Sequence, residues 1–292
     1  MPRWHSLVVL AVALPSLAIA QGRDSDFNWA ERISSGGWLR IHTVHGDIRV
    51  VEGSGDRAEV IGRKRGDDAA ELRVTAARSG DDVTICAVWE GGQCDAEGIH
   101  TTRKSWREGD ATVDFEVRLP RGVNIRAASG NGDVVVNGAH AEVQAMSGNG
   151  EITVASTGGP VRASSGNGDI DVSQAGGAVE ARSGNGDVRV TTRRGPVSAY
   201  SGNGSIDARM MTVSGTEDMT FRTGNGSITV ELPASFEGEI DARLPNGRLE
   251  SDFALRVEGR LDPRRLRATI GRGGPRVTIV SGSGGASIRK GA

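Results

Sequence analysis

The sequence predicts an all-β protein, a single-chain parallel β-solenoid (β-helix-like) with 18-residue rungs and a less regular N-terminal β region. Two observations predict this fold class. A Ser-Gly-Asn-Gly turn begins at residues 129, 147, 165, 183 and 201, and it returns as Thr-Gly-Asn-Gly at residue 223. The short segments on both sides of each turn alternate apolar and polar residues, which is the period of a half-buried β-strand.

Aligning the 18-residue units predicts two apolar columns. The strand after each turn contributes the pairs Val134 and Val136, Ile152 and Val154, Ile170 and Val172, Val188 and Val190, Ile206 and Ala208, and Ile228 and Val230. The strand before each turn contributes Ile125 and Ala127, Val143 and Ala145, Val161 and Ala163, Val179 and Ala181, and Val197 and Ala199, and we expect Met219 with Phe221 and Ile240 with Ala242 to continue that column. Period-2 alternation places each pair on one face, toward the core.

An antiparallel meander is the competing architecture, because Asn-Gly is a favoured two-residue hairpin turn. A meander, however, has no reason to place identical turns at alternate corners only. A fixed period of 18 residues instead lets each residue meet its counterpart one rung away, as in a solenoid. The period therefore favours parallel stacking, with rungs about 4.8 Å apart.

The turn asparagines are predicted to form a structural ladder at one corner. Asn tolerates the left-handed backbone conformation, the flanking glycines remove the steric cost, and stacked amides can bond to one another. The predicted ladder contains Asn131, Asn149, Asn167, Asn185, Asn203, Asn225 and Asn246.

The first 37 residues are predicted to lie outside the fold. Residues 1–20 have the pattern of a signal peptide: one Arg, a short apolar run, and Ala18-Ile19-Ala20 as a small-x-small cleavage site. Residues 21–37 are predicted to be an N-terminal linker. We therefore expect an exported protein without a transmembrane segment, located in the periplasm or at the cell surface.

Residues 38–118 are predicted to form the N-terminal β region, and residues 119–292 the repeat solenoid. The segments WLRIHTVHGDIRVVEG, AEVIGRK, ELRVTAAR and DDVTICAVW are predicted to be strands, and HGDI at 45–48 resembles the later turns. Trp29, Trp38, Trp89 and Trp106 all precede the repeats and are expected to close the N-terminal end of the core. The inserted loop 90–110 is long and polar, which makes it a candidate recognition element.

The two cysteines are predicted to form a disulfide. Cys86 and Cys94 are eight residues apart across a Gly-Gly turn. In an oxidising compartment, such a local bridge contributes about 2–3 kcal/mol by restricting the unfolded chain. We expect it to fasten a surface loop.

No catalytic, cofactor-binding or metal-ligating residues are predicted, and no cofactor. The Gly-Asn-Gly-Asp turns resemble calcium-binding nonapeptide repeats, but the acid column ends in Ser205 and Ser227, so a metal ladder would lose its ligands. The outward positions do not gather acids as polysaccharide-cleaving enzymes do. His42, His45, His100 and His140 are scattered along the chain, and each is expected to be a surface residue rather than a general base. The net charge of −2 gives no case for nucleic-acid binding.

The chain resembles the bacterial putative-adhesin family, a domain family of unknown function. The resemblance rests on the Asn-Gly-Asp-Val-type turns and on the segments 113–136, 227–250 and 266–288, and it covers roughly residues 38–290. It implies a β-solenoid-like fold and a role at the cell surface.

The sequence therefore predicts a non-enzymatic, exported cell-envelope or surface protein that acts as an adhesin or protein-interaction scaffold. The alternative is a polysaccharide-binding or polysaccharide-degrading β-helix protein. In either case, the expected partner is a protein or glycan at the cell surface.

Overall fold

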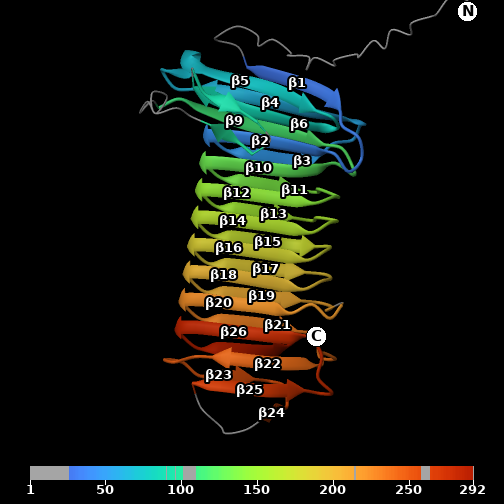
Figure 1. The fold of residues 1–292 in the computed structure, drawn as a ribbon, viewed down its shortest axis with the longest axis vertical. Helices are drawn as coiled ribbons and strands as arrows, with labels where there is room; N and C mark the ends of the chain where they lie inside the picture. Colours follow the sequence, from blue (N-terminus) through green and yellow to red (C-terminus); the bar gives the residue numbers. More distant parts are fainter. Residues whose placement is uncertain are drawn as a thin grey trace, which may run out of the picture.

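The computed structural model describes residues 26–89, 91–95, 97–100, 110–213, 215–257 and 264–291, and in these residues the chain folds into a stack of β-strands (Figure 1). The predicted signal peptide, residues 1–20, lies outside the described residues. Two large sheets face each other and enclose one core of Val, Ile, Ala, Leu and Phe side chains. The predicted parallel β-solenoid is confirmed.

In the described residues the first sheet, sheet A, has twelve strands. In spatial order they are β1 (Phe27–Arg32), β4 (Arg57–Arg65), β9 (Thr112–Leu119), β3 (Ile48–Glu52), β11 (Val134–Asn137), β13 (Ile152–Ala155), β15 (Ile170–Ala175), β17 (Val188–Thr192), β19 (Ile206–Met210), β21 (Ile228–Leu232), β27 (Ala286–Lys290) and β23 (Leu249–Ser251).

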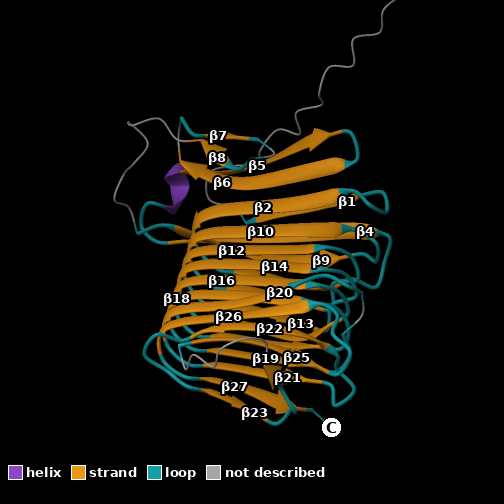
Figure 2. Ribbon diagram, turned by 60° about the horizontal axis from the view of Figure 1, so that its bottom comes forward, coloured by secondary structure: helices purple, strands orange, loops and turns teal. Residues whose placement is uncertain are grey.

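The second sheet, sheet B, has thirteen strands in the same part of the chain. In spatial order they are β24 (Arg256–Val257), β25 (Arg265–Ile270), β22 (Gly238–Arg243), β26 (Arg276–Ser283), β20 (Met219–Asn225), β18 (Val197–Asn203), β16 (Val179–Asn185), β14 (Val161–Asn167), β12 (Val143–Asn149), β10 (Asn124–Asn131), β2 (Trp38–His45), β6 (Asp82–Trp89) and β5 (Leu72–Ser79). A short pair, β7 (Gln93–Cys94) and β8 (Ile99–His100), and the 3₁₀ turn Ala69–Glu71 complete the elements; Figure 2 shows this pair at the N-terminal end.

Each rung consists of one strand of sheet B, a corner, one strand of sheet A and a return turn. Neighbouring rungs pair in parallel, so that Val143 lies opposite Val161 and Ile152 opposite Ile170. The register shifts once between β15 and β17, after Val172. Because the 18-residue rungs repeat an inward pattern of β-branched residues and alanines, the apolar columns stack from rung to rung, and the side chains at these positions are buried.

The first rung of this stack comes from the N-terminal region. Strand β2 pairs in parallel with β10, and β3 pairs in parallel with β11. His45 lies opposite Asn131, so the HGDI segment occupies a corner of the stack, as its resemblance to the later turns suggests. The two predicted regions, 38–118 and 119–292, thus share both sheets.

The N-terminal end is closed by antiparallel strands. Strand β4 pairs antiparallel with β9 and β1, and β5 pairs antiparallel with β6. Trp29 and Trp89 pack against the core at this end, whereas Trp106 lies outside the described residues. Strand β1 lies within residues 21–37, which the sequence analysis treats as a linker. There the alternating segment Phe27–Arg32 half-buries Phe27 and Trp29 by pairing with β4.

The C-terminal rungs depart from sequence order. Strand β26 lies between β20 and β22, so Val277 and Ile279 follow Met219 and Phe221 in the column, and Ile240 and Ala242 come one strand later (Figure 1). On its other side β22 pairs antiparallel with β25, which in turn pairs with β24 at the end of the sheet. The chain then returns, and β26 and β27 pair with β20 and β21.

Candidate functional site

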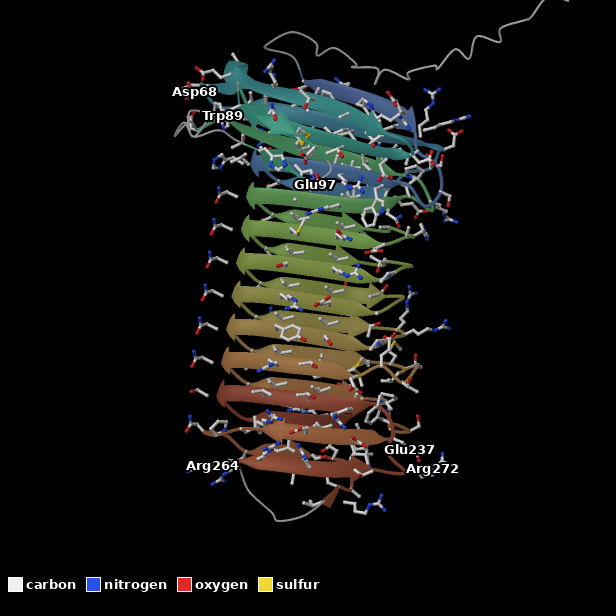
Figure 3. All side chains as sticks on the ribbon, in the orientation of Figure 1. Asp68, Trp89, Glu97, Glu237, Arg264 and Arg272 are labelled. Carbon is white, nitrogen blue, oxygen red and sulfur yellow. A yellow bond between two sulfur atoms is a disulfide. The ribbon has the colours of Figure 1, made fainter. Side chains whose placement is uncertain are left out.

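The repeat corner, defined here as the Ser-Gly-Asn-Gly-acid segment such as 183–187, is the most regular feature of the molecule. Its asparagines form a side-chain ladder in which each Nδ2 donates to the Oδ1 of the preceding rung at 2.7 or 2.8 Å, from Asn149 onto Asn131 through to Asn225 onto Asn203. His45 heads the ladder, since its Nδ1 is 3.1 Å from the Nδ2 of Asn131. Figure 3 shows this regularity as a column of side chains along one edge of the stack.

Asn246 does not belong to this ladder. The position after Asn225 is occupied by Ser283, because β26 is inserted into the stack next to β20. Asn246 instead donates from Nδ2 to the carbonyl oxygen of Gly282 at 3.0 Å. The ladder of asparagines therefore ends at Asn225, one rung before the inserted strand.

The serine of each corner is a structural residue that the sequence analysis missed. Ser147, Ser165, Ser183 and Ser201 are buried, and each hydroxyl donates to the carbonyl oxygen of the second corner glycine of the preceding rung at 2.8–3.0 Å. These serines have the same inward parity as the Val and Ala positions before them. That parity was readable from the sequence and distinguishes them from surface turn residues.

Both glycines of the corner are required by the close approach of the next rung. A Cβ built at Gly168, where φ is +152°, would lie 2.1 Å from the carbonyl oxygen of Gly150. A Cβ at Gly166 would lie 2.5 Å from the carbonyl oxygen of Gly148. No side chain fits at either position without moving backbone.

The acid at the end of the corner binds backbone of the next rung. Asp133 Oδ1 accepts the amide N–H of Glu151, and Asp187 Oδ1 accepts that of Ser205, both at 2.8 Å. Where the acid is replaced by serine, the hydroxyl oxygen of Ser205 accepts the amide of Ser227 at 3.3 Å. In the corner 183–187 every side chain therefore has a partner in a neighbouring rung, whereas Glu151 accepts a hydrogen bond from Thr153 of its own rung.

A second feature lies on the outer face of sheet B at the N-terminal end. Cys86 of β6 and Cys94 of β7 form a disulfide with a Cα–Cα distance of 6.0 Å. It fastens residues 91–95 and 97–100, which we call the disulfide flap, over β6 and β2. Of the predicted loop 90–110, the structure describes residues 91–95, 97–100 and 110.

His42 of β2 is buried beneath the flap. It is 5% exposed, and its Nε2 has no hydrogen-bond partner. A Cβ built at Gly98 of the flap would lie 3.4 Å from His42 Nδ1, so the turn rests on the imidazole. Burial, together with the charges of Arg126 and Arg40, lowers the pKa of His42 to about 4. The imidazole is consequently neutral at pH 7.

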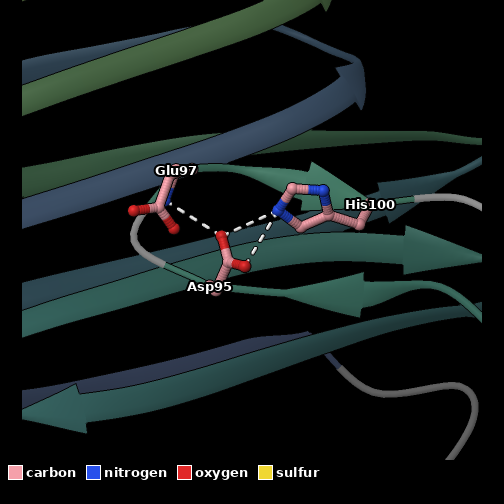
Figure 4. A group of neighbouring side chains, drawn as sticks. All are labelled: Asp95, Glu97 and His100. Carbon is pink, nitrogen blue, oxygen red and sulfur yellow. Dashed lines mark hydrogen bonds and ion pairs between the residues drawn. The ribbon is translucent and has the colours of Figure 1, made fainter.

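The turn of the flap gathers Asp95, Glu97 and His100 (Figure 4). Asp95 Oδ1 accepts the amide N–H groups of Glu97 and Gly98 at 2.9 and 3.2 Å, and both carboxylate oxygens lie 2.9 Å from His100 Nε2. The hydrogen bond with His100 holds the pKa of Asp95 below its usual range. Of the other predicted surface histidines, His140 lies elsewhere and pairs with Glu52 at 3.0 Å.

A third feature is a hollow of about 270 Å³ in the middle of the outer face of sheet B. We call it the Tyr200 patch; its polar lining residues are Arg162, Glu180, Ser198, Tyr200, Glu217 and Asp218. The Arg182 guanidinium stacks over the Tyr200 ring at 4.3 Å, and Glu180 binds Arg182. Within the described residues Glu217 makes no hydrogen bond or ion pair.

The Tyr200 patch coincides with a break in the period. The corner asparagines are 18 residues apart up to Asn203, but Asn203 and Asn225 are 22 residues apart. The longer connection between β19 and β20 carries Glu217 and Asp218 to the edge of the hollow. Asp218 is held there by the amide N–H of Arg276 at 2.9 Å.

These features define a two-sheet parallel β-solenoid protein with a strictly structural corner and an irregular outer face. The family model described as Toastrack DUF4097 matches residues 105–289, and the chain belongs to that family. No curated protein matches the chain.

Two solved structures are similar to the chain. One is a putative adhesin from Bacteroides fragilis NCTC 9343, which is 14% identical and has a TM-score of 0.43, with 91% of this chain and 97% of that chain covered. The other is a putative cell adhesion protein from Clostridium sporogenes ATCC 15579, which is 11% identical and has a TM-score of 0.29, with 91% of this chain and 100% of that chain covered.

Proposed function

We propose that the protein is an exported, non-enzymatic adhesion module that binds a protein partner at the cell surface through the outer face of sheet B. Membership of the Toastrack family and the signal-peptide pattern of residues 1–20 support the surface location. Among the described residues, no helix is long and apolar enough to cross a membrane.

The observation that carries the proposal is the contrast between constant and variable columns. At the corner, Ser, Gly and Asn recur because each is needed to bond or fit the next rung. On the outer face of sheet B one column contains Ala128, Met146, Ser164, Arg182, Tyr200 and Arg222, in which no two neighbouring rungs carry the same residue. A side chain that varies while its backbone repeats is free from the constraints of the stack and available for recognition.

The Tyr200 patch is the best candidate for the centre of this surface. Tyrosine and arginine are the residues that most often dominate binding energy at protein interfaces. Tyr200 is the single tyrosine of the chain, and it stands on the rigid sheet with Arg182 against its ring. A rigid aromatic anchor loses little conformational entropy on binding.

The proposal is tested by measuring how fluorescently labelled protein binds to whole cells and to isolated envelopes of the source bacterium. We expect saturable binding that falls at least tenfold for the variant Tyr200→Ala, which is the usual loss for a dominant interface residue. The matched control is Asp207→Ala, an exposed substitution on the opposite sheet, which should leave binding unchanged.

Treating the cells with protease distinguishes the proposed partner from a glycan. Binding that disappears after protease treatment supports a protein partner. Binding that survives protease but is competed away by envelope polysaccharide would instead support the alternative of a polysaccharide-binding protein.

A further inference from the structure

The hollow of the Tyr200 patch has an apolar part as well as its polar lining. Pro160, Ala178 and Pro196 also line it, and each directly precedes one of the successive strands β14, β16 and β18. The carbonyl oxygens of these three residues accept amide N–H groups of the preceding rung. What they add to the hollow is therefore mainly apolar surface, beside the aromatic ring of Tyr200. An apolar hollow with a few polar groups is the usual form of a binding site.

The guanidinium groups at the hollow are already paired. Arg162 binds Glu142 and lies 4.0 Å from a carboxylate oxygen of Glu180. Arg182, stacked over the Tyr200 ring, donates from Nε to Glu180 at 2.9 Å. The positive charge on this side of the hollow is thus balanced by carboxylates of the same sheet.

The acids at the opposite side are not balanced in this way. Glu217 makes no hydrogen bond or ion pair in the part of the chain that the structure describes. Asp218 accepts the backbone amide N–H of Arg276 at 2.9 Å, whereas the guanidinium of Arg276 binds Glu239 at 2.8 Å. A hollow that presents uncompensated carboxylates attracts a cationic group and disfavours an anionic one.

Glu217 and Asp218 lie on the connection between β19 and β20, where the spacing of the corner asparagines increases from 18 to 22 residues. The stack does not require this extension, because β20 pairs with β18 in the register of the other rungs, with Asn225 opposite Asn203. An extension that leaves the register unchanged and brings carboxylates to a hollow is a property of the surface. It is an observation independent of the hollow's apolar lining.

We propose that the Tyr200 patch binds a basic side chain, lysine or arginine, of the partner protein. Both side chains combine an apolar stem with a cationic head. The stem would lie against the apolar lining, and the head would reach Glu217 and Asp218. This inference rests on the proposed function, since it names what the partner brings to that interface. A calcium ion fits less well, because it needs six to eight oxygen ligands and has no use for an apolar lining.

The direct test is an NMR titration of purified ¹⁵N-labelled protein with acetylated, amidated tripeptides that carry Arg, Lys or Gln between two glycines. At low ionic strength the Arg and Lys peptides should shift the amide signals of Ser198, Tyr200, Glu217 and Asp218 saturably, with dissociation constants of about 1 mM. The Gln peptide should not shift them. Glu217→Gln should weaken the binding of both basic peptides about threefold or more.

The matched control is Glu250→Gln, which makes the same change in net charge at an exposed residue of β23 in sheet A. It should bind the basic peptides as the native chain does. Equal shifts with the Gln peptide, or equal affinities in the native chain and Glu217→Gln, would overturn the inference. Saturable shifts of Glu217 and Asp218 with Ca²⁺ and none with the basic peptides would also overturn it, in favour of a metal site.

Binding to isolated envelopes separates this inference from the proposed function. Glu217→Gln should lower envelope binding about threefold or more at low salt. The difference from the native chain should vanish at about 1 M NaCl, where the Debye length is about 3 Å. If Tyr200→Ala lowers envelope binding and Glu217→Gln does not, the basic side chain is wrong and the proposed function stands. If Tyr200→Ala binds envelopes as the native chain does, the proposed function itself is wrong.

Discussion

At the residue scale, the repeat corner is explained by contacts between identical residues of successive rungs. The serine hydroxyl, the asparagine amide and the acid each bond to the neighbouring rung, and the two glycines allow that neighbour to approach. The motif recurs because a substitution in one corner affects contacts with both the preceding and the following rung. The motif therefore has a structural role, and residues that bind a partner are to be sought outside it.

The first prediction concerns Gly168. Changing it to Val places a β-branched side chain where φ is +152° and where a Cβ would lie 2.1 Å from the Gly150 carbonyl oxygen. Strain and overpacking together should lower the free energy of unfolding by about 3 kcal/mol or more. The matched control is Gly80→Asn, at φ +62° with nothing within 4 Å of the new Cβ, which should cost less than about 1 kcal/mol. Urea denaturation measures both, and equal costs would contradict this account of the corner.

The second prediction concerns the acid of the corner. Asp187→Ser keeps an acceptor for the Ser205 amide, as the Ser205–Ser227 contact shows, so its cost should stay within about 0.5 kcal/mol. Asp187→Ala removes the acceptor and should cost about 1 kcal/mol. Because these carboxylates bind backbone amides, the thermal midpoint should not change when calcium is added or chelated. A midpoint that falls by many degrees on calcium chelation would show that the acid column is a metal ladder after all.

At the scale of elements, the 18-residue period predicts which repeat strands pair with one another, but it does not predict which strands lie at the two ends of the stack. Inward pairs such as Val161 and Ala163 were predictable because strand alternation and the 18-residue spacing are short-range signals. The segment Phe27–Arg32 was predicted to be a linker because its strand partner, β4, is remote in the sequence. Asn246 was misplaced for a similar reason, since nothing local indicates that β26 inserts before β22.

The candidate sites could not be predicted for the same reason, because their residues come together only in the folded chain. Asp95, Glu97 and His100 are close in sequence, and the spacing Asp-x-Glu-x-x-His was visible. Their convergence depends on the β7–β8 turn, and the burial of His42 depends on the disulfide that places this turn over β2. Similarly, Glu217 and Tyr200 line the same hollow only because the longer connection reaches its edge.

The third prediction concerns the flap as an element. The pKa of His42 is lowered from 6.5 to about 4 by burial and by Arg126 and Arg40, against the opposing charge of Asp95. An opened flap would therefore bind more protons than a closed flap between pH 6.5 and about 4. The stability of the closed flap should be fully present above pH 6.5 and should fall as the pH drops through this window.

Hydrogen exchange of the disulfide flap at pH 7 and pH 4.5 measures this change when each rate is divided by the rate of an unprotected amide at the same pH. The protection factor obtained in this way should be lower at pH 4.5. The double variant Cys86→Ser and Cys94→Ser is the companion experiment. Without the bridge the flap should open, and the pKa of His42 measured by NMR should rise toward 6.5, while exchange in the repeats stays unchanged. If the pKa of His42 does not move in this variant, the flap is not what buries it.

At the scale of the whole molecule, the stack is nearly one-dimensional. Each central rung pairs only with the rung before it and the rung after it. Antiparallel strands close the N-terminal end of both sheets and the C-terminal end of sheet B, whereas sheet A ends with β23 in a parallel pair with β27. Stability in such a stack is approximately a sum over rungs and their interfaces. The end strands matter for another reason, because they prevent further pairing at the open edges.

The last prediction follows from this additivity. Deleting residues 150–167 removes one complete rung and joins Asn149 to Gly168, which restores a Ser-Gly-Asn-Gly-Asp corner. All registers are kept, so the shortened protein should remain folded, with a β-type circular dichroism spectrum and a smaller urea m-value, since less surface becomes exposed on unfolding. Deleting residues 150–158 removes only half a rung and joins Asn149 to Gly159. Strand β14 would then follow β12 directly and would have to lie in sheet A instead of sheet B. The return turn before β14 would stand where a corner is needed. The hydrogen bond from Asn167 to Asn149 could not form. This variant should fail to fold. A folded nine-residue deletion, or an unfolded eighteen-residue deletion, would mean that the rung is not the unit from which this molecule is built.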